Sequence, residues 1–363
     1  MRGVVYRGQG HVEVSELPMP SLEHPRDVVV RVTRSGICGT DLHPYRGELL
    51  DFPAGTVLGH EFAGEVFAVG HEAPFEPGQR VFASDLIACG RCGECARGWH
   101  YQCTEGTLFG YAEVAGASVA GGQAEFVRVP FADVVLATTP AEVSDEQALF
   151  VGDVLTTAHT AVLEAGVRPG DTVVVIGAGP VGLLAAMCAE TAGAARVVIA
   201  DVHPRRLRQG RELGLTVVDP EVLLNPDTDL PDGVIGGAER VIIGGAERVI
   251  IGGAERVIEA VGSDEALDCA LRAAAPRGTV AVVGAHHSLA MPFPSGLAFA
   301  RELTLRFAVG DPIRLREQVL ALVRAGRIDP TVVVTHRFSL DDAPLAYQLF
   351  NAREVLKPII VMR

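Results

Sequence analysis

The sequence predicts an α/β protein with two parts, one rich in short strands and one built on a doubly wound parallel sheet. Three observations predict this class. Strand-like segments punctuated by Gly and Pro fill roughly the first 150 residues. From about Val154 onward, buried strand patterns alternate with helix patterns, which is the order of a parallel sheet covered by helices. A length of 363 residues also suits about two domains of ordinary size.

The individual elements follow from hydrophobic pattern and turn residues. In the first part, DVVVRVTRSG (27–36) and GEVFAVG (64–70) are typical strands. The second part has a strand, a glycine turn and a helix in 172–194, with further strands expected at 195–201, 279–285 and 303–309. An amphipathic helix is expected at 311–328, with Gly326 as its stop signal, and the tail 355–363 ends as a strand. We therefore assign residues 1–153 and 298–363 to the β-rich domain and 154–297 to the parallel-sheet domain.

Composition excludes several classes of partner. The net charge of −14 and the pI near 5.2 argue against nucleic acid or an anionic membrane as a partner. The longest apolar run, Val173–Ala189, is interrupted by Gly and Pro and is a poor membrane span. The first residues lack the apolar core of a signal peptide. We expect a cytoplasmic protein with a small-molecule substrate.

Four of the seven cysteines lie close together in CGRCGECARGWHYQC. They have the spacing C-x2-C-x2-C-x7-C: Cys89, Cys92, Cys95 and Cys103. Four thiolates saturate a tetrahedral zinc ion, so this ion would hold a loop rather than take part in chemistry. An iron–sulfur cluster also uses four thiolates, which leaves another metal as the alternative. The crowding indicates metal binding in a reducing compartment rather than a disulfide framework.

Two further segments, GICGTDLH and GHEFAGEVFAVG, together offer a thiol, imidazoles, a hydroxyl and carboxylates: Cys38, Thr40, Asp41, His43, His60 and Glu61. Each Cys or His alone would more often be structural. Together, a soft thiolate and an imidazole suit a catalytic zinc that keeps an open position. Asp153, in VGDVLTTAH at the junction of the two domains, offers a third ligand.

A glycine motif predicts a dinucleotide site. Gly177, Gly179 and Gly182 fit G-x-G-x-x-G between a predicted strand and a predicted helix, which identifies a Rossmann domain. The glycines permit a tight turn and let a pyrophosphate approach the helix N-terminus. Asp201 ends the next strand, where its carboxylate can accept hydrogen bonds from ribose hydroxyls and repel a 2′-phosphate. This favours NAD, while the nearby basic residues, Arg206 among them, leave NADP open.

These motifs, in this order, resemble the zinc-dependent medium-chain alcohol dehydrogenase family across essentially the whole chain except a repeat described below. GHEFAGEVFAVGHEA is similar to the zinc signature of that family. GGQAEFVRVPFADV and LFVGDVLTTAHTA resemble its formaldehyde-dehydrogenase-like branch. The resemblance implies a GroES-like β-rich catalytic domain with one structural and one catalytic zinc ion, a Rossmann domain that binds NAD, and a dimer or tetramer.

The resemblance also implies residue roles. Cys38, His60 and Asp153 would bind the catalytic zinc, with Asp153 standing where many alcohol dehydrogenases have cysteine. Glu61 matches a carboxylate that enters the zinc shell transiently. Asp41 matches a group that orients the ligand His60.

Further roles concern protons and the cofactor. Thr40 and His43 match a proton relay that runs through the nicotinamide ribose. Val181 matches a nicotinamide contact. Lys357, the single lysine of the chain, matches a cationic contact to the pyrophosphate.

Residues 235–258 spell the octapeptide IGGAERVI three times. Solenoid and propeller repeats need roughly 20–50 residues, so this period is too short for a repeat fold. We interpret it as an in-frame duplication before the fourth strand of the Rossmann sheet. We expect the last copy, distinguished by Glu259, Ala260 and Val261, to fill the strand. The others would loop out, with the segment VIIGGAERVII able to form a hairpin around Gly-Gly.

The expected function is hydride transfer between an alcohol, or hydrated formaldehyde, and NAD. Two alternatives stay open: a zinc-free quinone or enoyl reductase on the same fold, and a nucleotide-binding protein without activity.

Overall fold

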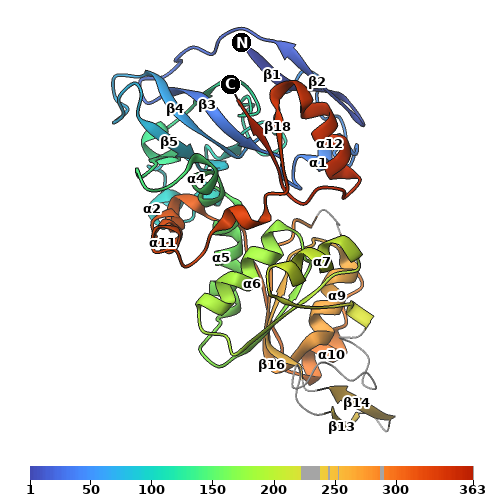
Figure 1. The fold of residues 1–363 in the computed structure, drawn as a ribbon. Helices are drawn as coiled ribbons and strands as arrows, with labels where there is room; N and C mark the ends of the chain where they lie inside the picture. The colour runs from blue at the N-terminus through green and yellow to red at the C-terminus, as the bar shows by residue number, and fades with distance from the viewer. Residues whose placement is uncertain (222–237, 244–245, 252, 287–289, 363) are drawn as a thin grey trace. The chain divides into compact units, whose positions relative to one another are not determined.

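The computed structural model describes residues 1–221, 238–243, 246–251, 253–286 and 290–362. The chain forms two compact units, residues 1–156 with 311–363 and residues 157–310 (Figure 1). The first is β-rich and the second is a helix-covered parallel sheet, so the predicted fold class is confirmed. Two boundaries differ from the prediction. The first falls after residue 156 rather than after residue 153. Residues 298–310, assigned from sequence to the β-rich domain, lie in the second unit because the strand Thr304–Phe307 pairs with its sheet.

The β-rich unit is organised around one seven-stranded sheet. Six strands follow the order β18-β19-β3-β4-β5-β9, and β8 also pairs with β3. Their bounds are β3 Val28–Gly36, β4 Phe62–Val69, β5 Arg80–Ala83, β8 Phe126–Val129, β9 Leu136–Thr138, β18 His336–Ser339 and β19 Pro358–Val361. Two small antiparallel pairs accompany it: β1 Arg2–Gly8 with β2 His11–Glu16, and β6 Leu86–Ile87 with β7 Thr107–Leu108.

Apolar side chains on one face of these strands form the core of this unit. Val28, Val30 and Val32 lie on one face of β3 and are buried with Phe62 and Val66 of β4, as expected for a period of two residues. Short helices fill the connections: α1 Leu42–Tyr45, α2 Gly93–Ala96, α3 Ala132–Val135, α4 Asp145–Val151, α11 Pro312–Arg324 and α12 Ala343–Asn351, with 3-10 turns η1 His100–Gln102, η2 Pro330–Val333 and η3 Leu340–Asp342. The predicted helix in 311–328 is thus confirmed.

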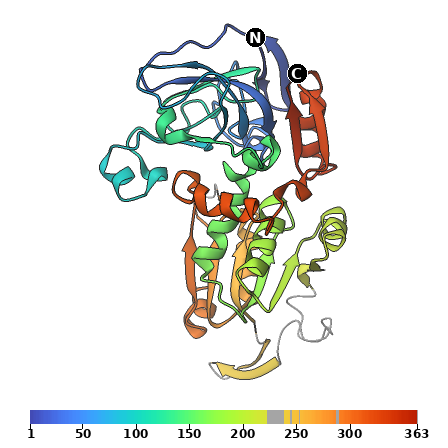
Figure 2. The same cartoon turned by 60° about the vertical axis from the view of Figure 1, so that its left-hand side comes forward.

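The second unit contains a six-stranded parallel sheet in the order β12-β11-β10-β15-β16-β17. Its strands are β10 Thr172–Ile176, β11 Arg196–Ala200, β12 Thr216–Val218, β15 Ala254–Glu259, β16 Ala274–Val282 and β17 Thr304–Phe307. The chain enters it through α5 Val154–Ala165, and the helices α6 Pro180–Thr191, α7 Pro204–Glu212, α9 Asp264–Ala273 and α10 Ser295–Ala300 connect the strands (Figure 2). Strand order reverses between β10 and β15, the place where such sheets bind dinucleotides.

The octapeptide repeat is divided between two structures. The last copy supplies β15, which lies between β10 and β16. The earlier copies supply β13 Ala238–Ile243 and β14 Ala246–Ile251, an antiparallel pair that both views draw apart from the main sheet (Figures 1 and 2). Both expectations are confirmed, while the predicted Gly-Gly turn falls outside the described residues.

Glu259 explains why the last copy is selected. Its side chain is fully buried and accepts hydrogen bonds from the amides of Val261 and Gly262, both at 2.8 Å. The earlier copies carry Ile243 and Ile251 at the matching position. An isoleucine has no acceptor for those two amides, so the last copy fits this strand end best.

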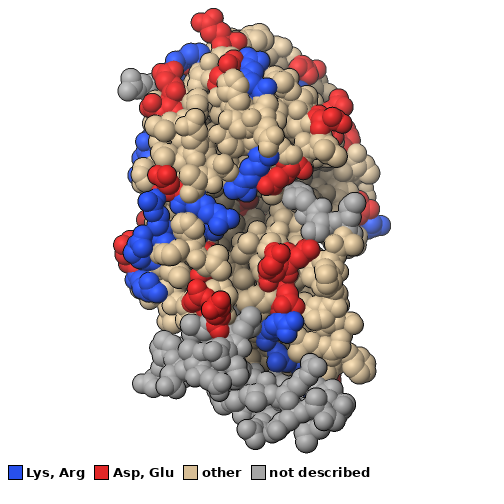
Figure 3. All heavy atoms as spheres, turned by 90° about the vertical axis from the view of Figure 1, so that its right-hand side faces the viewer, with Lys and Arg blue, Asp and Glu red and all other residues tan. Residues whose placement is uncertain are grey.

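The surface carries charged side chains of both signs. Acidic and basic side chains are interspersed on the face drawn in Figure 3, rather than gathered by sign. Within the described residues, none of the helices has both the length and the apolar content needed to cross a bilayer.

We predict that deleting residues 235–250, two octapeptide copies, leaves the Rossmann sheet intact, because β15 and Glu259 stay in place. The deletion removes the separate β13–β14 pair, whose VII segments have the composition of an aggregation-prone strand, and should reduce aggregation on heating. Thermal unfolding, light scattering and NADH binding measured for both chains test this. Loss of NADH binding in the shortened chain would show that the extra copies support the fold.

Candidate catalytic metal centre and cofactor loop

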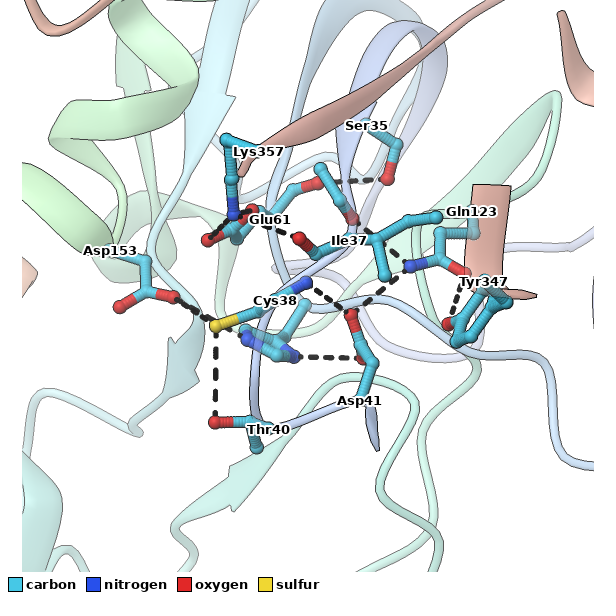
Figure 4. A network of polar contacts seen from close by, with 12 residues as sticks. Ser35, Ile37, Cys38, Thr40, Asp41, Glu61, Gln123, Asp153, Tyr347 and Lys357 are labelled. Carbon is cyan, nitrogen blue, oxygen red and sulfur yellow. Dashed lines mark hydrogen bonds and ion pairs between the residues drawn. The ribbon is translucent and has the colours of Figure 1, made fainter. Parts of the chain in front are cut away.

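Four potential metal ligands converge in the first unit: Cys38, His60, Glu61 and Asp153 (Figure 4). One ligand atom from each lies within 4.8 Å of the others. Sheet register causes this convergence. Ser35 of β3 pairs with Phe62 of β4 in antiparallel fashion, so residues just beyond these strand ends face each other.

Asp153 arrives from a different element, the loop after α4. That helix begins at a capping box in which Ser144 and Gln147 satisfy each other's backbone amides. Its end is held by the amide of Asp85, which donates to the carbonyl of Gly152 at 3.0 Å. A Cβ at Gly152 would collide with the carbonyl of Ala83, so glycine is required beside Asp153.

The distances among these atoms fit a tetrahedral zinc ion. At usual Zn–S, Zn–N and Zn–O lengths, ligand atoms of one tetrahedron lie roughly 3.3–3.6 Å apart. The Asp153 Oδ2 atom is 3.8 Å from the Cys38 Sγ and 3.4 Å from the His60 Nε2. A thiol and an imidazole are also donor types that bind zinc well, whereas calcium and magnesium prefer oxygen ligands.

Asp41 lies next to Cys38 and His60, the place that the family resemblance implies for a residue that orients His60. Its Oδ2 accepts hydrogen bonds from the Cys38 amide at 2.9 Å and from the Gln123 Nε2 at 3.2 Å, and its Oδ1 is 3.3 Å from the His60 Nδ1. The Tyr347 hydroxyl in turn donates to Gln123 at 2.8 Å. Two side chains that the sequence did not single out, Gln123 and Tyr347, therefore fix Asp41.

Lys357 has a partner that the sequence did not predict. Its side chain is 1% exposed and donates to both carboxylate oxygens of Glu61. The contact with a cofactor pyrophosphate that the resemblance implies stays a prediction. The Lys357 Nζ also donates to the carbonyl of Ile37 at 3.2 Å, and it lies 5.9 Å from the centre of the Phe150 ring. Lys357 thus holds Glu61 next to the cluster.

Burial and mutual charge shift the pKa values of the cluster. Burial raises the pKa of Glu61 to about 7, although Lys357 opposes this. Burial also raises the pKa of the Cys38 thiol, with Glu61 and Asp153 adding to the effect. For His60, burial alone would lower the pKa, but Asp41 and Asp153 outweigh it and raise the pKa well above its usual value. The metal-free cluster is therefore anionic enough to hold a proton on His60.

Thr40 and His43 lie at the edge of this cluster. The Thr40 Oγ1 is 3.9 Å from the Cys38 Sγ, and the His43 amide donates to the Thr40 carbonyl at 3.2 Å. The His43 Nδ1 contacts Glu48 at 2.5 Å. The sequence pattern did not identify Glu48, which lies in an ordinary-looking loop.

The four clustered cysteines form a second ligand group, with Sγ atoms within 4.8 Å of one another and no disulfide. The Cys92 and Cys103 sulfurs are 3.9 Å apart, close to the roughly 3.8 Å expected between thiolates on one tetrahedral zinc. The Cys95 and Thr104 amides lower the pKa of Cys92 to about 5, which favours the thiolate. These groups fit a closed structural zinc site.

This cysteine loop is tied to the rest of its unit. The His100 Nδ1 lies 3.0 Å from Asp311, which also caps α11 through the Arg314 amide at 3.0 Å. Arg26 donates to the Cys89 carbonyl at 2.9 Å and pairs with Asp133.

The glycine motif has the expected geometry. Gly177 follows β10 with a φ of +105°, and Gly179 is the N-cap of α6. A Cβ at Gly182 would collide with the Gly177 carbonyl, so the helix can approach the strand only with glycine. Val181 is half-buried in the first turn of this helix.

Asp201 ends β11 beside this loop and is 8% exposed. Its carboxylate accepts from the Ala178 amide at 2.8 Å and from the His203 amide at 2.7 Å. Arg206 lies 3.5 Å from the same carboxylate. The predicted cofactor residues Gly177, Gly179, Gly182, Asp201 and Arg206 are thus brought to one edge of the sheet.

We predict that zinc affinity of the Cys38–His60–Asp153 cluster rises with pH. Zinc must displace the proton on His60 and the proton on Cys38, whose pKa values are both raised, so binding is weak below those values and strong above them. Between pH 6 and 8 the affinity should rise about ten- to hundredfold per pH unit. Competition with a chromogenic chelator measures this zinc affinity at each pH. The variant Cys38→Ala should retain one zinc ion per chain, so it reports the four-cysteine site alone. A flat profile would contradict a protonated His60.

Comparison with known proteins agrees with the site. Residues 24–139 match the family of the alcohol dehydrogenase GroES-like domain, and residues 180–325 match that of zinc-binding dehydrogenases. The zinc-type alcohol dehydrogenase-like protein AdhB of Bacillus subtilis is 33% identical over 99% of this chain and 100% of its own. Glutathione-independent formaldehyde dehydrogenase of Pseudomonas aeruginosa is 37% identical, but over 64% of this chain and 61% of its own.

Among solved structures, the alcohol dehydrogenase TADH from Thermus sp. ATN1 is similar with a TM-score of 0.89 and 37% identity, covering 100% of both chains. Both domain matches, the full-length relatives and the two zinc-type ligand groups agree. The chain belongs to the zinc-dependent medium-chain alcohol dehydrogenase family, with a structural four-cysteine zinc site, a catalytic zinc site and an NAD(P)-binding domain.

Proposed function

We propose that this enzyme oxidises small alcohols, hydrated formaldehyde among them, with NAD, and that Cys38, His60 and Asp153 hold its catalytic zinc. The observation that supports this most is the convergence of a thiol, an imidazole and a carboxylate within 4.8 Å, next to the Thr40 hydroxyl. The partial similarity to formaldehyde dehydrogenase supports that substrate as one member of the set.

The charge of the ligand set suits alcohol oxidation. One thiolate, one neutral imidazole and one carboxylate balance the two charges of a zinc ion. Glu61 adds no net charge because Lys357 pairs with it. An alcohol that loses its proton here is therefore not repelled by its surroundings.

When bound, zinc supplies a Lewis acid that lowers the pKa of a coordinated hydroxyl, and the nicotinamide supplies the hydride acceptor. The residues of this chain then position and move the proton. The Thr40 hydroxyl accepts it from the substrate, and His43 releases it to solvent. Glu48 fixes the orientation of the His43 ring through its contact at Nδ1.

Asp201 supports NAD rather than NADP as the preferred cofactor. Two backbone amides fix its carboxylate at the end of β11, where the adenosine ribose lies in proteins with this fold. A 2′-phosphate would meet that fixed negative charge. Arg206, at 3.5 Å, reduces the repulsion without removing it.

We also propose a cytoplasmic location, where a reducing environment keeps the seven cysteines out of disulfides and available to zinc. A dimer or tetramer is proposed from the family resemblance.

We predict NAD reduction by short alcohols and by formaldehyde, lost on chelator treatment and restored by zinc. NADP should give a lower kcat/KM because of Asp201. Absorbance at 340 nm measures the reaction with both cofactors. Turnover that chelation leaves unchanged would favour a zinc-free reductase, and cofactor binding without turnover would favour a protein that only binds nucleotides.

We predict that His43→Ala slows turnover mostly at the lower end of the pH range, by about tenfold to a hundredfold, since hydroxide takes over proton removal as pH rises. A pH profile of kcat from 6 to 10 measures this. Glu48→Gln should give a smaller loss in the same direction. An equal loss at every pH would remove His43 from the relay.

A further inference from the structure

Asp85 is a carboxylate beside the metal centre that has no assigned role. It lies between β5 and β6, and its amide donates to the carbonyl of Gly152, the residue before the ligand Asp153. Its Oδ1 atom is buried and has no hydrogen-bond partner within the part of the chain that the structure describes. Asp85 also lies outside the group of atoms close enough to share the metal.

The other carboxylates around the centre are all engaged. Asp41 accepts from the Cys38 amide, Glu61 from Lys357, and Asp153 lies within 3.4 Å of the His60 Nε2. Asp85 therefore differs from its neighbours in having an oxygen left over. An unsatisfied buried acceptor costs about 1–3 kcal/mol, so a protein retains one mainly where a ligand satisfies it.

The charges of the metal ligands also act on Asp85. Burial raises the pKa of Asp85 well above its usual value, the charge of Asp153 raises it further, and His60 opposes this. Burial also raises the pKa of the Tyr101 phenol, and the charges of Asp85 and Asp153 add to it. The contact of the Asp85 amide with the Gly152 carbonyl at 3.0 Å places Asp85 next to the ligand Asp153.

We propose that Asp85 is a specificity-determining residue that hydrogen-bonds a second hydroxyl of the substrate, so that short diols and polyols are the preferred alcohols. This inference rests on the proposed function. A carboxyl group pairs with a hydroxyl as acceptor or as donor. A neutral hydroxyl is favoured over an ammonium group, because the Asp85 oxygen is buried and a charged group would lose far more hydration on reaching it.

A pair of substrates that differ by one hydroxyl tests this directly. The wild-type enzyme should oxidise 1,2-propanediol with a kcat/KM about 10- to 100-fold above that of 1-propanol, the range of one hydrogen bond to a carboxylate. Asp85→Leu should lose this preference by lowering kcat/KM for the diol, while 1-propanol stays within about threefold. Asp85→Asn, which keeps a hydrogen-bonding oxygen, should restore part of the preference.

Glu16→Gln, the same carboxylate-to-amide change on the exposed end of β2, is the matched control and should leave the preference unchanged. Zinc content and thermal unfolding of each variant report the fold. Calorimetric titration of the zinc- and NADH-loaded enzyme with 1,2-propanediol adds a binding readout, in which Asp85→Leu should weaken the diol about as much as it lowers kcat/KM.

The outcomes are distinct. Two results overturn the role of Asp85 and leave the proposed function standing. One is normal oxidation of 1-propanol by the wild-type enzyme without a preference for the diol. The other is an equal loss of kcat/KM on both substrates in Asp85→Leu. A preference for 1-amino-2-propanol over the diol overturns the hydroxyl assignment. If neither alcohol is oxidised, the proposed function fails, and diol binding that Asp85→Leu abolishes still supports the Asp85 contact.

Discussion

A buried carboxylate needs a cation, and this constraint governs the first unit of the molecule. Glu61 is fully buried, and the single lysine of the chain reaches it across 296 residues of sequence. Removing one partner from such a pair leaves an uncompensated charge and costs about 3–5 kcal/mol. The Cys38 thiol and Asp153 add two further acidic groups at the same place. The proton on His60 supplies a cation to this second pair of groups, and a zinc ion would take the place of that proton.

The positions of these groups are set by backbone rather than by side chains. The β3–β4 register aligns Cys38 with His60, and a Cβ at Gly36 would collide with the Glu61 carboxylate. Glycine at 36 therefore lets the Glu61 carboxylate approach β3 closely, and glycine at 152 lets the backbone before Asp153 approach the Ala83 carbonyl. Gly177 and Gly182 have the same effect in the second unit, where they let a helix begin directly against a strand. In both units, glycine creates the space in which the chemistry takes place.

The features that could be predicted from the sequence are those that depend on a local pattern of residues. The cysteine spacing, the glycine motif after an apolar strand, the Cys38 and His60 segments and the choice of the last repeat copy all depend on neighbouring residues. The contact of Lys357 with Glu61 could not be predicted, because it joins residues 296 positions apart in the sequence and leaves no local signal. Glu48, Gln123, Tyr347 and Asp85 were missed for the same reason. The second domain boundary was predicted too early, at residue 298 instead of 311. The helix before β17, α10, is only a short segment, and its sequence resembles a linker.

The burial of Lys357 also affects how this protein can be handled. Reagents that attack primary amines, such as succinimidyl dyes, glutaraldehyde or epoxide resins, normally find many lysines on a protein surface. This chain offers its one lysine at 1% exposure. Such reagents should therefore leave Lys357 unmodified in the folded enzyme. Reaction at Lys357 would then serve as a direct chemical report that the metal centre has opened.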